Sequence, residues 1–373
     1  MLGHVGVALF GNILLLAFLT TASAGQSPAH EAARRFMRGA NFGNFLEAPK
    51  GANWGARYEA EDLENVRREG FDHIRLPVRW SDYAGPAPGH QLSADIFARA
   101  DSLITNALSQ KLGVIVNLHH FDEFTDNPPA HTNKLMALWR QIAAHYAGAP
   151  DTLAFEILNE PRDAATTVVM NPIYAGAIQE IRKTNPKRTL FIGPGRWNQV
   201  SELKNLQLPD DERNLIVTIH CYEPFYFTHQ GATWSGPDTK VKGIQFPGPP
   251  AAPLVPDPSL HINTWVSNWI HRYNIETGTN NPSSSEAFRK AIRAARQWSL
   301  ENNRPVHMGE FGCYIQADEK SRIRFHAEFR RALDEAGMGW AIWDWKAGFR
   351  YWDDRRRAPV EGMREALFGK RGG

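Results

Sequence analysis

Short apolar runs rich in β-branched and aromatic residues recur along the chain, and each is bounded by polar or turn-forming residues. Such runs are typical of buried strands. Eight of them cover residues 36–42, 71–76, 112–118, 153–158, 189–192, 215–220, 305–308 and 340–343.

Between these runs the apolar residues follow a helical spacing, and several of the segments follow Asp, Ser or Asn residues suited to helix capping. The helical segments are 62–69, 96–110, 135–146, 173–183, 287–300 and 322–336. Alternation of strand and helix predicts a parallel sheet, and eight strands favour a closed barrel because no edge is left over. We therefore expect an α/β fold, a (β/α)8 TIM barrel, in one catalytic domain over residues 25–373.

Residues 231–285 break this regularity with a segment rich in Pro and Gly around 246–258. Trp265 and Trp269 follow at helical i, i+4 spacing, and residues 283–285 resemble the N-cap of the next helix. The preceding strand ends at His220, so we expect the segment to leave the C-terminal face of the barrel and to wall a cleft there.

Residues 1–24 have the pattern of a signal peptide, with an apolar stretch over 5–19 and a small-residue Ala22-Ser23-Ala24 ending. The segment before the apolar stretch contains no Lys or Arg, so an uncleaved anchor stays open. We expect a secreted or periplasmic, monomeric protein with no stable membrane association after signal removal.

The composition narrows the classes of partner. A net charge of +2 provides no basic surface for nucleic acid. Twelve Trp residues exceed the needs of the core, and their flat faces suit sugar rings. The only cysteines, Cys221 and Cys313, lack metal-binding spacing, and whether they form a disulfide stays open.

Polar and aromatic residues gather at the ends of the predicted strands, where (β/α)8 barrels place their catalytic groups. Two of them are carboxylic acids: Glu160 follows the run 153–158, and Glu310 closes the run 305–308 between Gly309 and Gly312. Glycosidic cleavage needs such a pair, one to protonate the leaving oxygen and one to attack the anomeric carbon or activate water. The sequence leaves the two stereochemical outcomes open, because they depend on a distance.

Seven motifs in order along residues 38–367 make the chain resemble glycoside hydrolase family 5, the cellulase family, and its endoglucanase-type members most of all. They are 38–44 (RGANFGN), 74–77 (IRLP), 117–120 (NLHH), 159–161 (NEP), His220-x-Tyr222, 309–312 (GEFG) and Trp343. The run 227–234 (FTHQGATW) supports the endoglucanase likeness. Cys221, where an aromatic residue is common, and Lys346 and Arg350, in a basic loop after the last strand, depart from the pattern.

The resemblance implies a role for each residue. Glu160 is the acid/base and Glu310 the nucleophile, which forms a covalent glycosyl intermediate in a retaining reaction. Catalytic support is implied for Arg75, Asn159, His220 and Tyr222. Substrate contacts are implied for Asn44, Glu47, His119, His120, Trp234 and Trp343.

These roles predict a retaining endo-β-1,4-glucanase that needs no cofactor or metal and acts on β-linked polysaccharide or oligosaccharide. The alternatives are a β-mannanase, xylanase or mixed-linkage glucanase with the same pair, a non-catalytic carbohydrate-binding barrel, and a metal-assisted hydrolase. Against a metal centre, His119 and His120 are adjacent at a strand end, so we expect their side chains to point to opposite faces.

Overall fold

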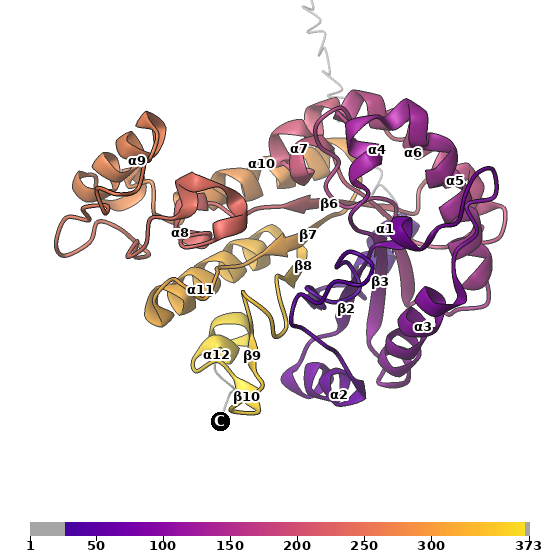
Figure 1. Ribbon diagram of the computed structural model, residues 1–373, viewed down its shortest axis with the longest axis horizontal. Coiled ribbons are helices and arrows are strands. Elements are labelled where there is room, and N and C mark those ends of the chain that lie inside the picture. The colour runs from indigo at the N-terminus through magenta and orange to yellow at the C-terminus, as the bar shows by residue number, and fades with distance from the viewer. Residues whose placement is uncertain (1–26, 370–373) are drawn as a thin grey trace, which may run out of the picture.

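The computed structural model describes residues 27–369, so the predicted signal peptide lies outside the described residues. Eight parallel strands, each hydrogen-bonded to its neighbours in chain order, close into a barrel (Figure 1). Their bounds are β1 Arg38–Asn41, β2 His73–Val78, β3 Gly113–Leu118, β4 Leu153–Glu156, β5 Leu190–Ile192, β6 Leu215–His220, β7 Val306–Phe311 and β8 Gly339–Ile342. The predicted (β/α)8 barrel is confirmed.

Helices follow most of the strands and surround the barrel (Figure 1). The longer ones are α2 Ala60–Glu69, α3 Ala94–Ser109, α5 Pro128–His145, α6 Thr167–Arg182, α9 Thr264–Ile275, α10 Glu286–Asn302 and α11 Glu319–Ala336. Short helices are α1 Pro28–Ala33, α4 Asp122–Asp126, α7 Gly195–Asn198, α8 Phe225–Thr228 and α12 Met363–Phe368. Single 3-10 turns lie at η1 Trp80–Tyr83, η2 Val200–Asn205, η3 Thr233–Ser235, η4 Pro237–Thr239 and η5 Gly278–Asn280, and β9 Trp352–Asp353 pairs with β10 Ala358–Pro359.

Two apolar clusters fill the molecule. The larger packs the strands against the outer helices. In the smaller, Ala29 and Ala32 of α1 pack with Phe36 against side chains from the beginnings of the strands, among them Ile115 and Phe191. Because α1 covers this N-terminal end, the opposite end of the barrel is the one available for a site.

Several predicted boundaries were wrong by three or more residues, among them the starts of α5, α6 and α11 and the end of β7. α5 begins at Pro128 rather than at 135, because the Asn127 side chain caps the Ala130 N–H and proline is favourable in the first helical turn. β7 extends to Phe311, so Glu310 lies within the strand rather than at its close. The polar Glu310 interrupts the apolar pattern although its backbone still pairs with β6.

The long excursion after β6 contains α9, and Trp265 and Trp269 lie on it as their spacing predicted. Ser285 is the N-cap residue of α10, as predicted, but its side chain makes no capping hydrogen bond. Figure 1 shows α8 beside the barrel and α9 well beyond it, on the side of β6 and β7. Cys221 and Cys313 are both buried free thiols. Among the described residues, no helix is long and apolar enough to cross a membrane.

Candidate active site

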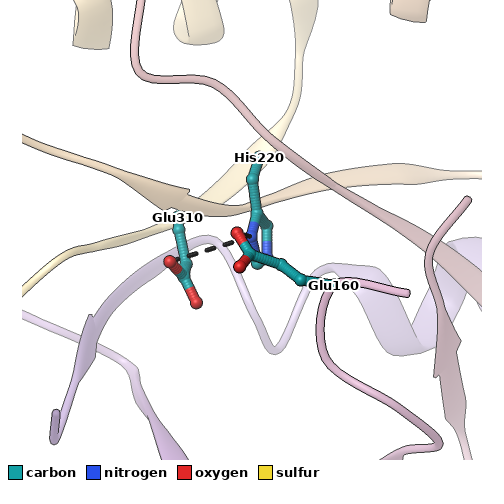
Figure 2. Close-up of side chains that lie close together, drawn as sticks. All are labelled: Glu160, His220 and Glu310. Carbon is teal, nitrogen blue, oxygen red and sulfur yellow. Dashed lines mark hydrogen bonds and ion pairs between the residues drawn. The ribbon is translucent and has the colours of Figure 1, made fainter. Parts of the chain in front are cut away.

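The two predicted catalytic carboxylates meet at the C-terminal end of the barrel. Glu160 follows β4 and Glu310 comes from β7, and each has a carboxylate oxygen within 4.8 Å of the other's and of a ring nitrogen of His220. Figure 2 shows the side chains of Glu160, Glu310 and His220 converging, with the Glu160 carboxylate against the His220 ring. This short separation matches the ~5–5.5 Å of retaining glycosidases better than the ~6.5–9.5 Å of inverting ones.

Arg75 on β2 is the centre of the hydrogen-bond network beneath these carboxylates. Its guanidinium is fully buried and donates from Nη1 to Glu310 Oε1 at 2.7 Å and to Asn41 Oδ1 at 2.8 Å. It also donates from Nη2 to Asn159 Oδ1 at 2.6 Å. Arg75 thus binds Glu310, the predicted nucleophile, and fixes the orientation of Asn159 as well.

The second oxygen of Glu310 is held by Tyr222, whose hydroxyl donates to Oε2 at 2.8 Å. Burial raises the pKa of Glu310, whereas the Arg75 charge and the Tyr222 hydrogen bond lower it. Desolvation is the largest of these effects because the carboxyl is almost completely buried. The donors to both oxygens nevertheless favour ionisation of Glu310 before Glu160.

Glu160 lacks such a cationic partner. Its Oε1 lies 2.8 Å from His220 Nδ1, and burial raises its pKa to about 7. The backbone of Glu160 has φ of 46°, a left-handed conformation that is costly for a residue other than glycine. The two carboxyl environments therefore differ in the way that an acid and a nucleophile require.

The His220 ring is held at both nitrogens: Nδ1 faces Glu160 Oε1, and the Asn198 side-chain amide lies 3.3 Å from Nε2. An ionised carboxylate only accepts hydrogen bonds, so Nδ1 carries the proton when Glu160 is ionised. Burial lowers the pKa of His220 to about 4. A neutral His220 thus donates its Nδ1–H to the ionised Glu160.

Two glycines give these groups room. A Cβ on Gly309 would lie 2.4 Å from Thr218 Oγ1 and 2.9 Å from His220 Nε2. A Cβ on Gly312 would lie 2.1 Å from the Trp343 carbonyl oxygen. The glycines near Glu310 therefore leave room for the Thr218 and His220 side chains and for the Trp343 backbone.

The loop after β1 carries Asn44 and Glu47. Asn44 is half-buried with φ of 64°, and Glu47 is buried, with its carboxylate accepting from the backbone N–H groups of Asn44 and Phe45. Burial raises the pKa of Glu47 to about 7. Since both oxygens are used by their own loop, a direct sugar contact from Glu47 stays a prediction.

His119, His120 and Trp343 lie side by side. The His119 ring stacks on Trp343 at 5.6 Å and contacts the His120 ring edge-on at 4.6 Å. The expectation that the two histidines point to opposite faces was wrong, because β3 ends at Leu118 and strand alternation does not continue beyond it. Asn117 Nδ2 donates to His119 Nδ1 at 3.2 Å, which leaves Nε2–H of His119 as a donor.

Trp234 and the basic residues lie further out. Trp234 in η3 is 61% exposed and contacts Tyr314 edge-on at 4.7 Å. Lys346 is paired with Asp62 at 2.8 Å, so its charge is neutralised within the protein. The basic loop after β8 is thus less basic in effect than its sequence suggested.

Sequence reasoning missed three residues of this network: Glu156, Asn41 as a partner of Arg75, and Asn198. Glu156 on β4 is completely buried and binds Arg75 through both oxygens, at 2.6 Å each. A carboxylate inside an otherwise apolar strand requires a buried cation, and Arg75 in another strand was the available one. That signal could have identified the pair. Asn198 follows the short strand β5 and had no recognisable motif.

These features define a (β/α)8 hydrolase with two carboxylic acids on strands 4 and 7. Residues 37–348 match the family model described as Cellulase (glycosyl hydrolase family 5). The chain therefore belongs to glycosyl hydrolase family 5.

Named relatives agree with this family. Endoglucanase H of Acetivibrio thermocellus is 28% identical over 314 residues, which cover 84% of this chain but only 30% of that protein. Endoglucanase C of the same species is 28% identical over 312 residues, which cover 80% of this chain and 87% of that protein. The chain thus spans about a third of the first relative and most of the second.

Solved structures of Thermotoga maritima Cel5A are similar over nearly their whole length. The complex with cellobiose has a TM-score of 0.77 at 33% identity and covers 91% of this chain and 99% of that one. The complex with mannotriose has a TM-score of 0.77 at 32% identity, with the same coverage.

Proposed function

We propose that the protein is a retaining endo-β-1,4-glucanase that cleaves internal bonds through a covalent glycosyl-enzyme intermediate. The observation that carries the proposal is the short separation of the Glu160 and Glu310 carboxylates, with Arg75 and Tyr222 on Glu310 alone. Relatives named endoglucanase support the substrate class.

In the first step, a carboxylate oxygen of Glu310 attacks the anomeric carbon, and the bond from that carbon to the glycosidic oxygen breaks. The proton of Glu160 passes to the departing oxygen, so the leaving sugar departs as an alcohol. The pKa of about 7 keeps this proton on Glu160 below neutral pH. Glu310 becomes an ester of the glycosyl group.

In the second step, the ionised Glu160 removes a proton from a water molecule, which attacks the anomeric carbon. The bond to Glu310 breaks and its carboxylate returns to the donors Arg75 and Tyr222. The neutral His220 donates to Glu160 while Glu160 is ionised, which stabilises this state. Two displacements restore the original β configuration.

Asn159 is proposed to bind the sugar 2-hydroxyl. Its Oδ1 accepts from Arg75, which turns the amide Nδ2–H groups toward the remaining side of the site. Hydrogen bonds to the 2-hydroxyl strengthen in the transition state of glycosidases. An equatorial 2-hydroxyl, as in glucose, is the expected partner.

Endo action is supported by aromatic rings on both sides of the carboxylate pair. On the side of β1 and β3, contacts run from Trp343 through His119 and His120 to the half-exposed Trp54, whose ring lies 5.9 Å from His120. On the side of β6, Tyr222 contacts His229 at 4.9 Å, and Trp234 lies on the following loop. A chain held on both sides is cleaved internally.

The test compares viscosity loss with reducing-end release on a soluble cellulose derivative, with mannan and xylan in parallel. The proposal predicts a viscosity drop that precedes most reducing-end release, and slower turnover of mannan and xylan. A viscosity drop that lags behind would indicate action at chain ends. Faster mannan turnover would favour the alternative suggested by the Cel5A complex with mannotriose.

A metal-assisted reaction is the second chemical alternative, since Glu160, His220 and Glu310 are close enough to share one cation. The guanidinium of Arg75 on Glu310 disfavours a second positive charge there. We propose a reaction without metal, and full activity in excess chelator is the expected result.

We also propose that the protein is secreted with removal of residues 1–24 and that it is a monomer.

A further inference from the structure

α9 presents two tryptophans on one side, four residues apart. Trp265 is 73% exposed, whereas Trp269 is half-buried against Tyr226 and Tyr273. Residues at i and i+4 lie on the same helix face, so both indoles lie on one side of α9. A tryptophan this exposed buries little of its apolar area within the domain.

The helix beneath this surface is firmly held. Val266, Ile270 and Tyr273 are buried, and the Tyr273 hydroxyl accepts from the Gln245 N–H at 2.8 Å. Asn274 exchanges two hydrogen bonds with the backbone of Leu254, at 2.8 and 2.9 Å. The indoles therefore lie on an ordered platform rather than on a free loop, which lowers the entropy cost of binding a ligand.

A continuous row of aromatic rings connects this platform to the catalytic centre. It begins at Tyr222, whose hydroxyl donates to Glu310, and ends at Trp269. The successive centroid distances are 4.9 Å for Tyr222–His229, 4.4 Å for His229–Phe225, 6.1 Å for Phe225–Tyr226 and 5.3 Å for Tyr226–Trp269. Figure 1 shows the same order of elements, from the barrel through α8 to α9.

We propose that Trp265 and Trp269 bind a β-glucan chain beyond the sugars next to the cleaved bond. This inference rests on the proposed function, since it takes the same polysaccharide as occupant. Flat indole faces suit the C–H faces of β-linked sugars. The charges of Arg272 and Glu276 pair with each other at 2.9 Å, so neither is left over to select an ionic partner.

The surface lies far along the row from the catalytic pair, so only long chains reach it. Trp265→Ala should lower kcat/KM on a long β-glucan relative to kcat/KM on cellotriose by roughly three- to tenfold, the size of one aromatic contact. Trp265→Phe should restore most of the ratio because it keeps a flat ring. Leu300→Ala on α10, which removes a side chain that is 60% exposed, is the matched control and should leave the ratio at the parental value.

The outcomes separate this inference from the proposed function. If Trp265→Ala leaves the ratio of kcat/KM on long β-glucan to kcat/KM on cellotriose unchanged, the inference is wrong. An equal loss on both substrates would also contradict it, because that result indicates a general structural effect. A parental enzyme inactive on both glucans overturns the proposed function itself. A lowered ratio with the Phe variant near the parental value supports the platform.

Discussion

Arg75 and Glu156 form a two-pronged ion pair directly beneath the catalytic carboxylates, with both hydrogen bonds at 2.6 Å and both side chains buried. The same guanidinium binds Glu310. Glu156 therefore shares the cation with the nucleophile and adds a negative charge that raises the pKa of Glu160. Glu156 thus affects the pKa of the proposed acid Glu160 directly and that of the proposed nucleophile Glu310 through Arg75.

Glu156→Gln should move the pH profile of kcat/KM to lower pH. The alkaline limb reports loss of the Glu160 proton, and removing the neighbouring charge lowers that pKa. The acidic limb should follow, because Arg75 is then left to stabilise ionised Glu310 more strongly. The measurement is kcat/KM against pH on a soluble substrate.

The control for that variant is Glu69→Gln. Glu69 is also a buried carboxylate with an arginine partner, Arg364 at 2.7 Å, and it accepts from the Tyr351 hydroxyl at 2.6 Å. Both variants should lose about 3 kcal/mol of unfolding free energy, as expected when one partner of a buried ion pair is removed. Only Glu156→Gln should shift the two limbs of the kcat/KM pH profile. Identical profiles for the two variants would show that Glu156 does not affect the pKa values of Glu160 and Glu310.

Glu160→Gln should lose far more rate on natural glucans than on activated aryl glycosides. Proton donation contributes roughly 10²–10⁴-fold, and good leaving groups need it least. The comparison is made on the glycosylation step, measured as the initial burst, because the variant also lacks the base of the second step. An equal loss on both substrates would place the acid elsewhere.

Glu310→Ala should abolish turnover, and azide should partly restore it on an activated aryl glycoside. The small anion occupies the space of the missing carboxylate while Glu160 is unchanged. The product of rescue should be an α-glycosyl azide, identified by NMR. Full activity of Glu310→Ala without azide would refute its assignment as nucleophile.

Gly312→Ala should destabilise the fold by about 1–3 kcal/mol, because the new Cβ would meet the Trp343 carbonyl oxygen at 2.1 Å and the backbone must shift. Gly148→Ala is the control, since nothing lies within 4 Å of its Cβ position. Thermal unfolding midpoints compare the two. Equal midpoints would show that the backbone at Trp343 can shift to admit the new Cβ without loss of stability.

The fold was predictable because the eight strands are buried apolar runs separated by amphipathic helices. The positions of Glu160 and Glu310 at one end of the barrel were predictable because their motifs fall at or near strand ends, whereas the roles of these residues, of Arg75 and of Tyr222 rest on the family resemblance and stay a prediction. Sequence alone could not show that the oxygens of Glu47 bind their own loop or that His119 and His120 touch, because both depend on the backbone path after a strand.

Glu156 shows a different limit. Within residues 153–158 it was read as part of an apolar strand, although a carboxylate in such a run requires a buried cation, and the contact across β3 identifies that cation as Arg75. The pKa of Glu310 shows a related limit, because burial raises it although Arg75 lies beside the carboxylate. Burial depends on the packing of the whole barrel and cannot be judged from neighbouring residues in the sequence.

The most direct test of the account is to trap the covalent intermediate. A 2-deoxy-2-fluoro cellobioside with a good leaving group should inactivate the enzyme, and mass spectrometry of its peptides should find one glycosyl group on Glu310. Pre-incubation with cellotriose should slow the labelling. Turnover of cello-oligosaccharides with inversion and no labelled peptide, or a label on another carboxylate, would contradict the account.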